Sequence, residues 1–357
     1  MALKSLVIWA HSECRSNAAL YAAVRKLAAE KGIAVKICLW NQKLQPEFRK
    51  IEIEDAVIVG EDYAKGLAVL RKFGGAGAVQ VFCVYQNSSA WRRLIVEAKR
   101  GGARVVVTAE APCEMCLGVR AWLKRLYYRW VLPWRVRAAV KAADLFISSS
   151  GEMGIDRLIR LGWKREKIVP FGYASPRLNV EVEKVSSFRF QAGGFKFRVS
   201  GRREKVEELR VLHLGSEAAY RGVKVAEEAA RIAGVELVKT GGKLSEEELV
   251  KAIREADVVV GCGYCEPWGM RINDVLLEGV PVIVSDGMGA AVVCDWYGCG
   301  CAVPKGDAQA LARVLKRCKD EPEFLERLRS GAKVAAKELL PENRAKAWLN
   351  AVLGSRG

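Results

Sequence analysis

The chain has 357 residues, of which 51% are hydrophobic and 28% charged, a composition that excludes a disordered chain and leaves room for two domains of about 150 residues each. No apolar stretch approaches the ~18 residues of a membrane-spanning helix, and Met1 to Ala10 enters a strand directly without signal-peptide architecture, so we expect a cytoplasmic protein. The net charge of +17 favours anionic partners (nucleotide phosphates, nucleic acid or an anionic membrane surface) and does not choose among them.

The first half of the chain alternates short apolar runs with longer amphipathic ones. Strands are expected over residues 3–10, 34–40, 55–60, 78–85, 103–108, 145–149 and 167–171. Helices are expected over residues 17–31, 62–73, 89–100 and 152–161. This alternation predicts an open parallel sheet covered on both faces.

The segment 176–208 breaks the alternation. Phenylalanines at every second position flank a Gly193–Gly194 pair, a pattern that predicts a β-hairpin whose polar positions are basic. We interpret the segment as a linker excursion packed on one face, with recruitment of an acidic partner as the alternative.

The second half returns to alternating strands and helices. Strands are expected over residues 210–214, 235–239, 257–260 and 281–284. One helix is expected to end at about Ile232, and the next to begin after Ser245, which caps its N-terminus. Further helices are expected over residues 270–277, 307–318, 321–330 and 343–353.

The most informative stretch runs from Glu266 to Pro281. It combines the Gly-rich turn after the strand at 257–260 with the start of the next helix, so free backbone N–H groups favour an anion at the strand's carboxyl end. Glu266 lies on the turn and Asp274 inside the helix. Two carboxylates beside a phosphate site suggest a ligand with hydroxyls and a phosphate, such as a sugar nucleotide.

These residues resemble a known family. The pattern E-x-x-G-x-x-x-x-[E/D]-x-x-x-x-G-x-P-V, beginning at Glu266, is similar to the donor-binding signature of family-4 retaining glycosyltransferases of the GT-B fold (glycosyl transferases group 1). Asp274 is one methylene shorter than the family's second glutamate. The runs 285–289 and 298–307 also match.

The resemblance implies an α/β protein with two Rossmann-like doubly wound parallel-sheet domains facing a cleft. The implied parts are an acceptor domain over 1–175, a linker over 176–208, a nucleotide-sugar-binding domain over 209–340 and a terminal helix over 341–357 that crosses back to the first domain. Pro341 marks the break before that helix.

The family places two cations on the donor diphosphate after the strand at 210–214. Here those positions are Ser216 and Arg221, so the resemblance implies a phosphate clamp by Arg221 and leaves one cation missing or supplied from elsewhere. Glu266 would bind sugar hydroxyls and Asp274 the ribose, and no metal or cofactor would be needed. The implied donor-binding residues are Gly215, Ser216, Arg221, Lys243, Leu244, Glu266, Trp268, Gly269, Met270, Arg271 and Asp274.

Glu110 ends an apolar strand of the first domain, at a position where many family members have a histidine. A carboxylate there would orient donor or acceptor hydroxyls or act as a base, and a structural salt bridge is the alternative. We therefore take Glu266, Glu110 and Arg221 as the candidate catalytic residues. The chain has two histidines, His11 after the first strand and His213 within an expected core strand, which argues against Ser-His-Asp or His-rich metal chemistry.

The segment 118–143 interleaves cations with aromatic residues. Its cations are Arg120, Lys124, Arg125, Arg129, Arg135, Arg137 and Lys141, and its aromatic residues are Trp122, Tyr127, Tyr128, Trp130 and Trp134. This pattern suits an anionic membrane interface, where lipid-linked acceptors of the family dock. An ordinary amphipathic surface helix and an RNA-binding helix are the alternatives.

Cysteine spacing gives a weaker signal. Cys113/Cys116 and Cys262/Cys265 are C-x-x-C pairs, but they lie in different expected domains, which disfavours one zinc site. We expect the cysteines to be buried as small hydrophobic side chains or to form structural disulfides. Asn and Gln total 13, a low number that hints at a thermophile, where intracellular disulfides occur.

Together with these patterns, the resemblance implies a retaining glycosyltransferase that moves a sugar from a nucleotide-sugar donor to a glycan or lipid-linked acceptor at the cytoplasmic membrane face. The alternatives are a sugar-nucleotide epimerase or phosphorylase of the same fold, or a basic nucleic-acid-binding protein.

Overall fold

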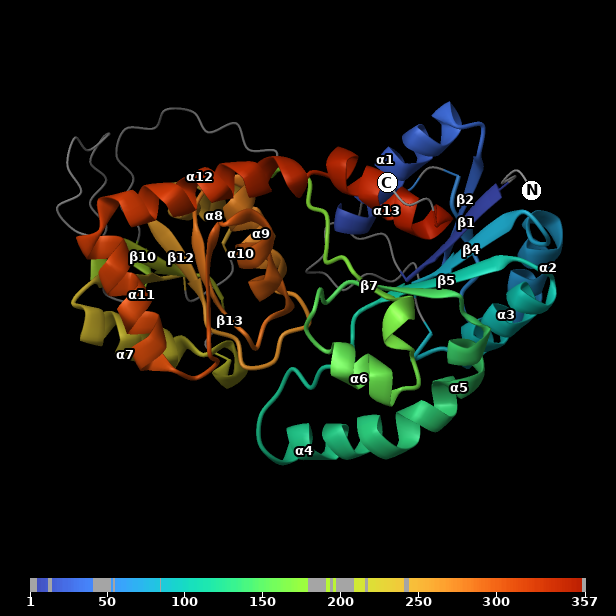
Figure 1. Ribbon diagram of the computed structural model, residues 1–357, viewed down its shortest axis with the longest axis horizontal. Helices are drawn as coiled ribbons and strands as arrows, with labels where there is room; N and C mark the ends of the chain where they lie inside the picture. Colours follow the sequence, from blue (N-terminus) through green and yellow to red (C-terminus); the bar gives the residue numbers. More distant parts are fainter. Residues whose placement is uncertain are drawn as a thin grey trace. The chain divides into compact units, whose positions relative to one another are not determined.

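The computed structural model describes residues 5–11, 15–40, 53, 55–83, 85–178, 191–192, 195–196, 209–215, 218–240 and 244–354. The chain divides into two compact units, which are drawn in Figure 1. Unit 1 comprises Met1–Glu114, Gly118–Pro176 and Leu339–Gly357, and unit 2 comprises Met115–Leu117 and Arg177–Glu338. Within the described ranges, every helix is too short or too polar to span a bilayer.

Unit 1 is built on a seven-stranded parallel sheet with the order β3-β2-β1-β4-β5-β6-β7. Its strands are β1 (Ser5–Ala10), β2 (Ala34–Leu39), β3 (Val57–Ile58), β4 (Ala78–Phe82), β5 (Arg104–Ala109), β6 (Leu145–Ser148) and β7 (Ile168–Pro170). Its helices are α1 (Arg15–Glu30), α2 (Tyr63–Phe73), α3 (Ser89–Arg100), α4 (Val119–Leu126), η1 (Tyr127–Val131), α5 (Leu132–Ala142), α6 (Ile155–Arg160), η2 (Arg165–Lys167) and α13 (Pro341–Leu353). Parallel neighbours need crossover connections, and these helices supply them.

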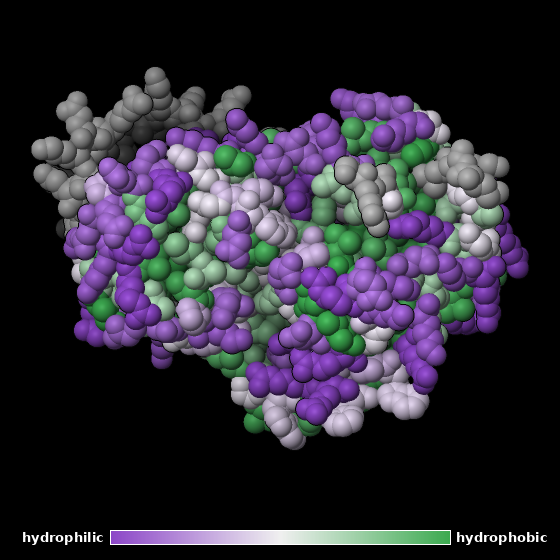
Figure 2. Space-filling model, in the orientation of Figure 1, coloured by the Kyte–Doolittle hydropathy of each residue, from purple (hydrophilic) through white to green (hydrophobic). Residues whose placement is uncertain are grey.

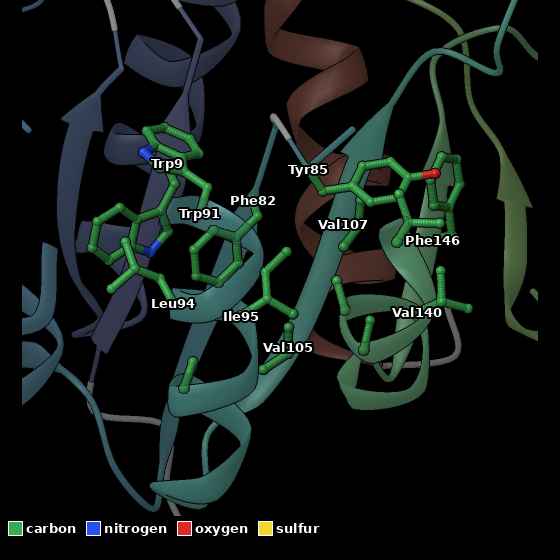
Figure 3. Packing of buried hydrophobic residues seen from close by; sticks show 14 of the residues in the cluster. Trp9, Phe82, Tyr85, Trp91, Leu94, Ile95, Val105, Val107, Val140 and Phe146 are labelled. Carbon is green, nitrogen blue, oxygen red and sulfur yellow. The ribbon is translucent and has the colours of Figure 1, made fainter. Parts of the chain in front are cut away.

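Strand β1 shows how both faces of this sheet are covered. Successive side chains of a strand point to opposite faces, so Val7 and Trp9 pack with α3 and α5, whereas Leu6 packs with α1 and α13. On the first face Trp9 stacks on Phe82 at 5.2 Å and meets the edge of Trp91 at 5.9 Å (Figure 3). Both faces are therefore buried, as a parallel sheet requires.

The terminal helix α13 belongs to unit 1. It packs against α1, and Trp348 and Val352 are buried beside Leu6 of β1. Pro341 occupies its first turn, where a missing backbone N–H has no cost. The Nε of Arg104, on β5, donates to the Val352 carbonyl at 3.0 Å and ties the helix end to the sheet.

Unit 2 is built on a five-stranded parallel sheet with the order β11-β10-β12-β13-β14. Its strands are β10 (Arg210–His213), β11 (Glu236–Lys239), β12 (Val258–Gly261), β13 (Val282–Ser285) and β14 (Gly300–Val303). Its helices are η3 (Ala219–Arg221), α7 (Val223–Ala233), α8 (Glu246–Glu255), α9 (Met270–Leu277), η4 (Gly289–Ala291), α10 (Val292–Tyr297), α11 (Ala308–Asp320) and α12 (Pro322–Glu338). The two Rossmann-like parallel-sheet units confirm the predicted fold class.

Some elements differ from the sequence-based expectation. The helix expected over 321–330 continues as α12 to Glu338. Gly331 does not end the helix and is the residue at which α12 passes close to another backbone. A Cβ on Gly331 would lie 2.2 Å from the Gly298 carbonyl oxygen, so this glycine serves packing and not helix termination. The pair β8 (Gln191–Ala192) and β9 (Phe195–Lys196) is antiparallel, and the rest of residues 179–208 lies outside the described residues.

Candidate functional site

The turn between β12 and α9 is held in place by the loop that follows β13. The Glu266 N–H donates to the Gly287 carbonyl at 2.9 Å, and the Glu266 carbonyl accepts from the Gly289 N–H at 3.1 Å. The Trp268 carbonyl accepts from the Ala290 N–H at 2.9 Å. Both backbone groups of Glu266 are fixed in this way, so the direction in which its side chain leaves the backbone is defined.

A small pocket opens at the carboxyl ends of β10 and β12. Its lining residues are His213, Leu214, Arg221, Val259, Val260, Gly261, Cys262, Gly263, Glu266, Gly269, Arg271, Ile272 and Met288. All of them belong to unit 2. Ligands of open α/β sheets bind at this edge, where the strands end.

Arg221 and Glu266 form the charged pair of the pocket. Arg221 ends η3, the element that follows β10 in the chain, and its Nη1 lies 3.6 Å from Oε1 of Glu266. The two side chains are 27% and 13% exposed, so both are largely withdrawn from water. Burial raises the pKa of Glu266, and the Arg221 charge opposes that rise.

Two polar atoms of the pocket are buried without a hydrogen-bond partner. They are Nε of Arg221 and Nδ1 of His213. Buried polar atoms are nearly always satisfied, by protein, by water or by a ligand. A ligand that brings hydrogen-bonding oxygens would satisfy both nitrogens.

His213 is a polar pocket residue that the sequence analysis did not assign to the site, and Leu214, Cys262 and Met288 are among the other lining residues that it did not assign. His213 was interpreted as part of a core strand, and it is indeed the last residue of β10 and 2% exposed. The last side chain of a parallel strand, however, faces the ligand-binding edge of the sheet. That position was the signal that could have identified it.

The predicted residues of α9 and of the turn before it do not all line the pocket. Gly269 and Arg271 line the pocket. Asp274 does not line it, and its Oδ2 pairs with Nη1 of Arg271 at 3.2 Å. The Trp268 side chain is 1% exposed and donates from Nε1 to Oδ1 of Asn273 at 2.8 Å, so the indole lies in the core and not at the pocket surface.

Of the remaining predicted donor residues, one adjoins Arg221, two do not line the pocket and two lie outside the described part of the chain. Gly215 adjoins Arg221, since a Cβ on it would lie 3.2 Å from Cδ of that arginine. Leu244 precedes α8, is half-buried and does not line the pocket, and Met270 begins α9 without lining it. Ser216 and Lys243 lie outside the described residues.

Glu110 belongs to unit 1. It follows β5, its side chain is exposed, and its Oε1 accepts a hydrogen bond from the Tyr173 hydroxyl at 2.9 Å. The Glu110 carbonyl accepts from Nε2 of Gln86 at 3.2 Å. These bonds fix the loop after β5 and leave the carboxylate accessible to solvent.

Six of the described cysteines are buried. Burial raises the pKa of the Cys262 thiol in the pocket wall to about 12, so it stays protonated at neutral pH. It therefore behaves as a small hydrophobic side chain, which is one of the two interpretations that the sequence left open.

A second surface of interest lies on unit 1, along α4, η1 and α5. Val119, Trp122, Trp130 and Trp134 on it are 56–77% exposed. In Figure 2 hydrophilic and paler side chains alternate at the lower edge of the view, where Figure 1 places α4 and α5. The segment 118–143 contains no acidic residue, so the surface is both apolar and basic.

Comparison with known protein families gives one match, over part of the chain. Residues 202–335 match the family model described as Glycosyl transferases group 1. No curated protein is similar enough in sequence to match the chain.

Solved structures of similar fold cover nearly the whole chain. HepE from Anabaena, in complex with UDP, is 12% identical with a TM-score of 0.58, over 98% of this chain and 100% of that one. A glycosyltransferase from Rickettsia africae is 13% identical with a TM-score of 0.62, over 99% and 100%. A putative UDP-N-acetylglucosamine 2-epimerase from Listeria monocytogenes is 12% identical with a TM-score of 0.53, over 98% and 96%. The fold is therefore the GT-B fold, and the family match over residues 202–335 supports a group 1 glycosyltransferase.

Proposed function

We propose that this protein is a retaining glycosyltransferase, which moves a sugar from a nucleotide-sugar donor to a glycan or lipid-linked acceptor. The observation that carries the proposal is the pocket of unit 2, where Arg221 and Glu266 lie side by side. In this pocket Nε of Arg221 and Nδ1 of His213 have no hydrogen-bond partner. A cation for a diphosphate and a carboxylate for sugar hydroxyls are the groups that such a donor requires. One solved structure of this fold is described as a complex with UDP-glucose, a donor of this class.

Arg221 is the group that we assign to the leaving diphosphate. Its Nε–H is buried without a partner, and its Nη1 lies beyond good hydrogen-bond distance of Glu266, so a phosphate oxygen would satisfy the guanidinium. Negative charge grows on the leaving oxygen as the bond between sugar and phosphate breaks. A fixed cation therefore stabilises the transition state more than the bound donor. Because the chain supplies this charge itself, we propose transfer without a metal ion.

Glu266 is the group that we assign to the hydroxyls of the transferred sugar. Burial disfavours its charged form, as the raised pKa shows, and hydrogen bonds from hydroxyl groups would offset that cost. Backbone bonds to the loop after β13 set the direction in which this side chain leaves the backbone, and Arg221 lies 3.6 Å from its Oε1. We expect this fixed carboxylate to orient the sugar for attack by the acceptor.

Asp274 remains our proposal for the ribose hydroxyls. It is held by Arg271, which does line the pocket, so the pair places a carboxylate next to the pocket rim. In unit 1, we propose that the exposed Glu110, with Tyr173 fixing one of its oxygens, orients an acceptor hydroxyl or takes its proton.

We further propose that the surface of α4, η1 and α5 rests on an anionic membrane at its cytoplasmic face. Exposed indoles favour the headgroup region and cations favour anionic lipid, and this surface combines both without an acidic residue. Such contact would bring a lipid-linked acceptor to the enzyme.

An epimerase is the second candidate, because one similar structure is described as a putative UDP-N-acetylglucosamine 2-epimerase. Both reactions start from a sugar nucleotide, so the products distinguish them. An epimerase converts the sugar nucleotide without an acceptor, whereas a transferase releases nucleoside diphosphate only as sugar is transferred or hydrolysed.

The deciding experiment is a titration of the full chain with UDP, GDP and ADP and with their glucose conjugates. Binding is measured by thermal shift and by calorimetry. One nucleotide is expected to bind. Arg221→Met should weaken its binding at least tenfold, and Glu266→Ala should abolish transfer while the protein still folds. Arg231→Met is the matched control, because Arg231 is 72% exposed and pairs with Glu228 on the surface of α7. Absence of binding to every nucleotide would overturn the proposal.

A further inference from the structure

The ring of His213 lies against the phosphate clamp that we assign to Arg221. A Cβ on Gly215 would lie 3.9 Å from Cε1 of His213 and 3.2 Å from Cδ of Arg221, so both side chains adjoin one point of the pocket wall. The His213 side chain is 2% exposed, lines the pocket and has no hydrogen-bond partner at Nδ1. A hydrogen bond from Nδ1 to a ligand in the pocket would satisfy this buried ring nitrogen.

The charges around His213 are already matched before a ligand binds. Arg221 faces Glu266 across the pocket, Lys239 of β11 pairs with Glu227 of α7, and Arg271 of α9 pairs with Asp274. A bound diphosphate would add negative charge that these three ion pairs do not neutralise. Among the described residues of the pocket, His213 is the side chain that can add a positive charge by taking up a proton.

We propose that His213 is a further ligand-contacting residue of this pocket, whose Nδ1 takes up a proton and donates it in a hydrogen bond to a diphosphate oxygen of the donor. The inference rests on the proposed function. Protonated His213 would supply a second positive charge beside that of Arg221. Ser216 cannot supply this charge, because a serine side chain is neutral. The proton comes from solvent as the donor binds, and no covalent bond is formed or broken.

The free protein holds this ring neutral. Burial lowers the pKa of His213, and the charges of Arg221 and Lys239 lower it as well, whereas a backbone hydrogen bond with Arg221 and the charge of Glu227 oppose this. A bound diphosphate reverses the balance, because its charge favours the imidazolium. By linkage, each pH unit by which the ligand raises the titration midpoint corresponds to tenfold tighter binding to the protonated form.

The chain has two histidines, so a carbon–proton NMR spectrum of the Cε1–H groups resolves this question directly. The His11→Gln variant assigns the two signals. The titration of His213 is followed from pH 5 to pH 9 in the free protein and with saturating UDP, GDP, ADP or inorganic pyrophosphate, whichever calorimetry shows to bind. We expect the midpoint of His213 to rise by at least one pH unit with ligand and that of His11 to stay constant.

Affinity measured against pH gives the second readout. Binding of the same nucleotide should weaken about tenfold more between pH 6 and pH 8 in the wild-type protein than in His213→Asn, and this comparison cancels titration of the nucleotide itself. A bound nucleotide that leaves the His213 midpoint unchanged would overturn the inference and leave the proposed function standing. If neither a nucleotide nor pyrophosphate binds, the proposed function and this inference both fail. The wild-type spectra decide the outcome even if the variant does not fold.

Discussion

Gly222 and Cys262 bring the two halves of the pocket together. A Cβ on Gly222 would lie 2.0 Å from the Cys262 carbonyl oxygen, and Gly222 has a φ of +71°. The residue before it is Arg221, and the turn that carries Glu266 begins just after Cys262. The close backbone approach at this glycine is therefore what places the cation beside the carboxylate.

Gly222→Ala is predicted to destabilise unit 2 and to weaken nucleotide binding together. The left-handed backbone costs an alanine about 1–2 kcal/mol, and overpacking against a carbonyl adds about 1–3 kcal/mol. Denaturant unfolding measures the loss. Gly234→Ala is the matched control, because Gly234 has a φ of +62° but its Cβ would meet only the flexible Nζ of Lys319, at 3.8 Å. Equal losses in the two variants would show that close approach is not the cause.

Glu266→Gln is predicted to increase stability at neutral pH. The pKa of Glu266 is raised mainly by burial, so the folded protein binds its proton more tightly than the unfolded chain does. The wild type therefore loses stability as the pH rises above the ordinary carboxyl value of 4.5, up to the native pKa, whereas a glutamine does not titrate.

Urea unfolding of both proteins between pH 3.5 and pH 8 measures this difference. The gap should vanish at the acid end and reach a plateau above the native pKa. Glu326→Gln on α12, where the carboxylate is 60% exposed, provides the surface control. A Glu266→Gln protein that is less stable than the wild type at pH 7 would mean that the attraction of Arg221 exceeds the cost of burial.

Much of the fold was predictable because its signals are local. The run from β12 through the turn to α9 lies within one short stretch, where an apolar strand, glycines and a helix start follow one another. Glu266 could be selected from that stretch alone. The alternation of strands and helices likewise predicted two parallel sheets, since parallel strands need long crossovers.

The features that were missed depend on contacts between distant residues. Gly331 looks like a helix end until its approach to Gly298 is known, and β14 has a Gly- and Cys-rich sequence whose strand character comes from pairing with β13. His213 reads as a core residue because its pocket is formed by a turn far along the chain. No sequence period encodes such an approach.

Trp268 and Asn273 are predicted to hold the site turn against α9 as a coupled pair. Asn273 is fully buried and accepts from the indole N–H, so Asn273→Ala would leave that donor buried without this acceptor, at a cost of about 1–3 kcal/mol. Trp268→Phe removes the donor together with part of the packing. A double-mutant cycle in denaturant should give a coupling energy of about 0.5–3 kcal/mol, and additive losses would show that the hydrogen bond does not stabilise the turn.

The last prediction concerns the basic and aromatic surface of unit 1. Replacement of Trp122, Trp130 and Trp134 by serine is expected to lower binding to phosphatidylglycerol vesicles at least tenfold, because the indoles are 56–77% exposed and are free to enter the headgroup region. Vesicle flotation or surface plasmon resonance measures the change, and binding to purely zwitterionic vesicles should be weak even in the wild type because the cations then lack a partner. Val334→Ser on α12 of unit 2, which removes an apolar side chain that is 51% exposed, controls for a general loss of surface hydrophobicity.

If the tryptophan variant binds anionic vesicles as tightly as the wild type, the segment is an ordinary surface helix. If both proteins bind single-stranded RNA more tightly than they bind vesicles, the basic residues serve nucleic acid instead of lipid.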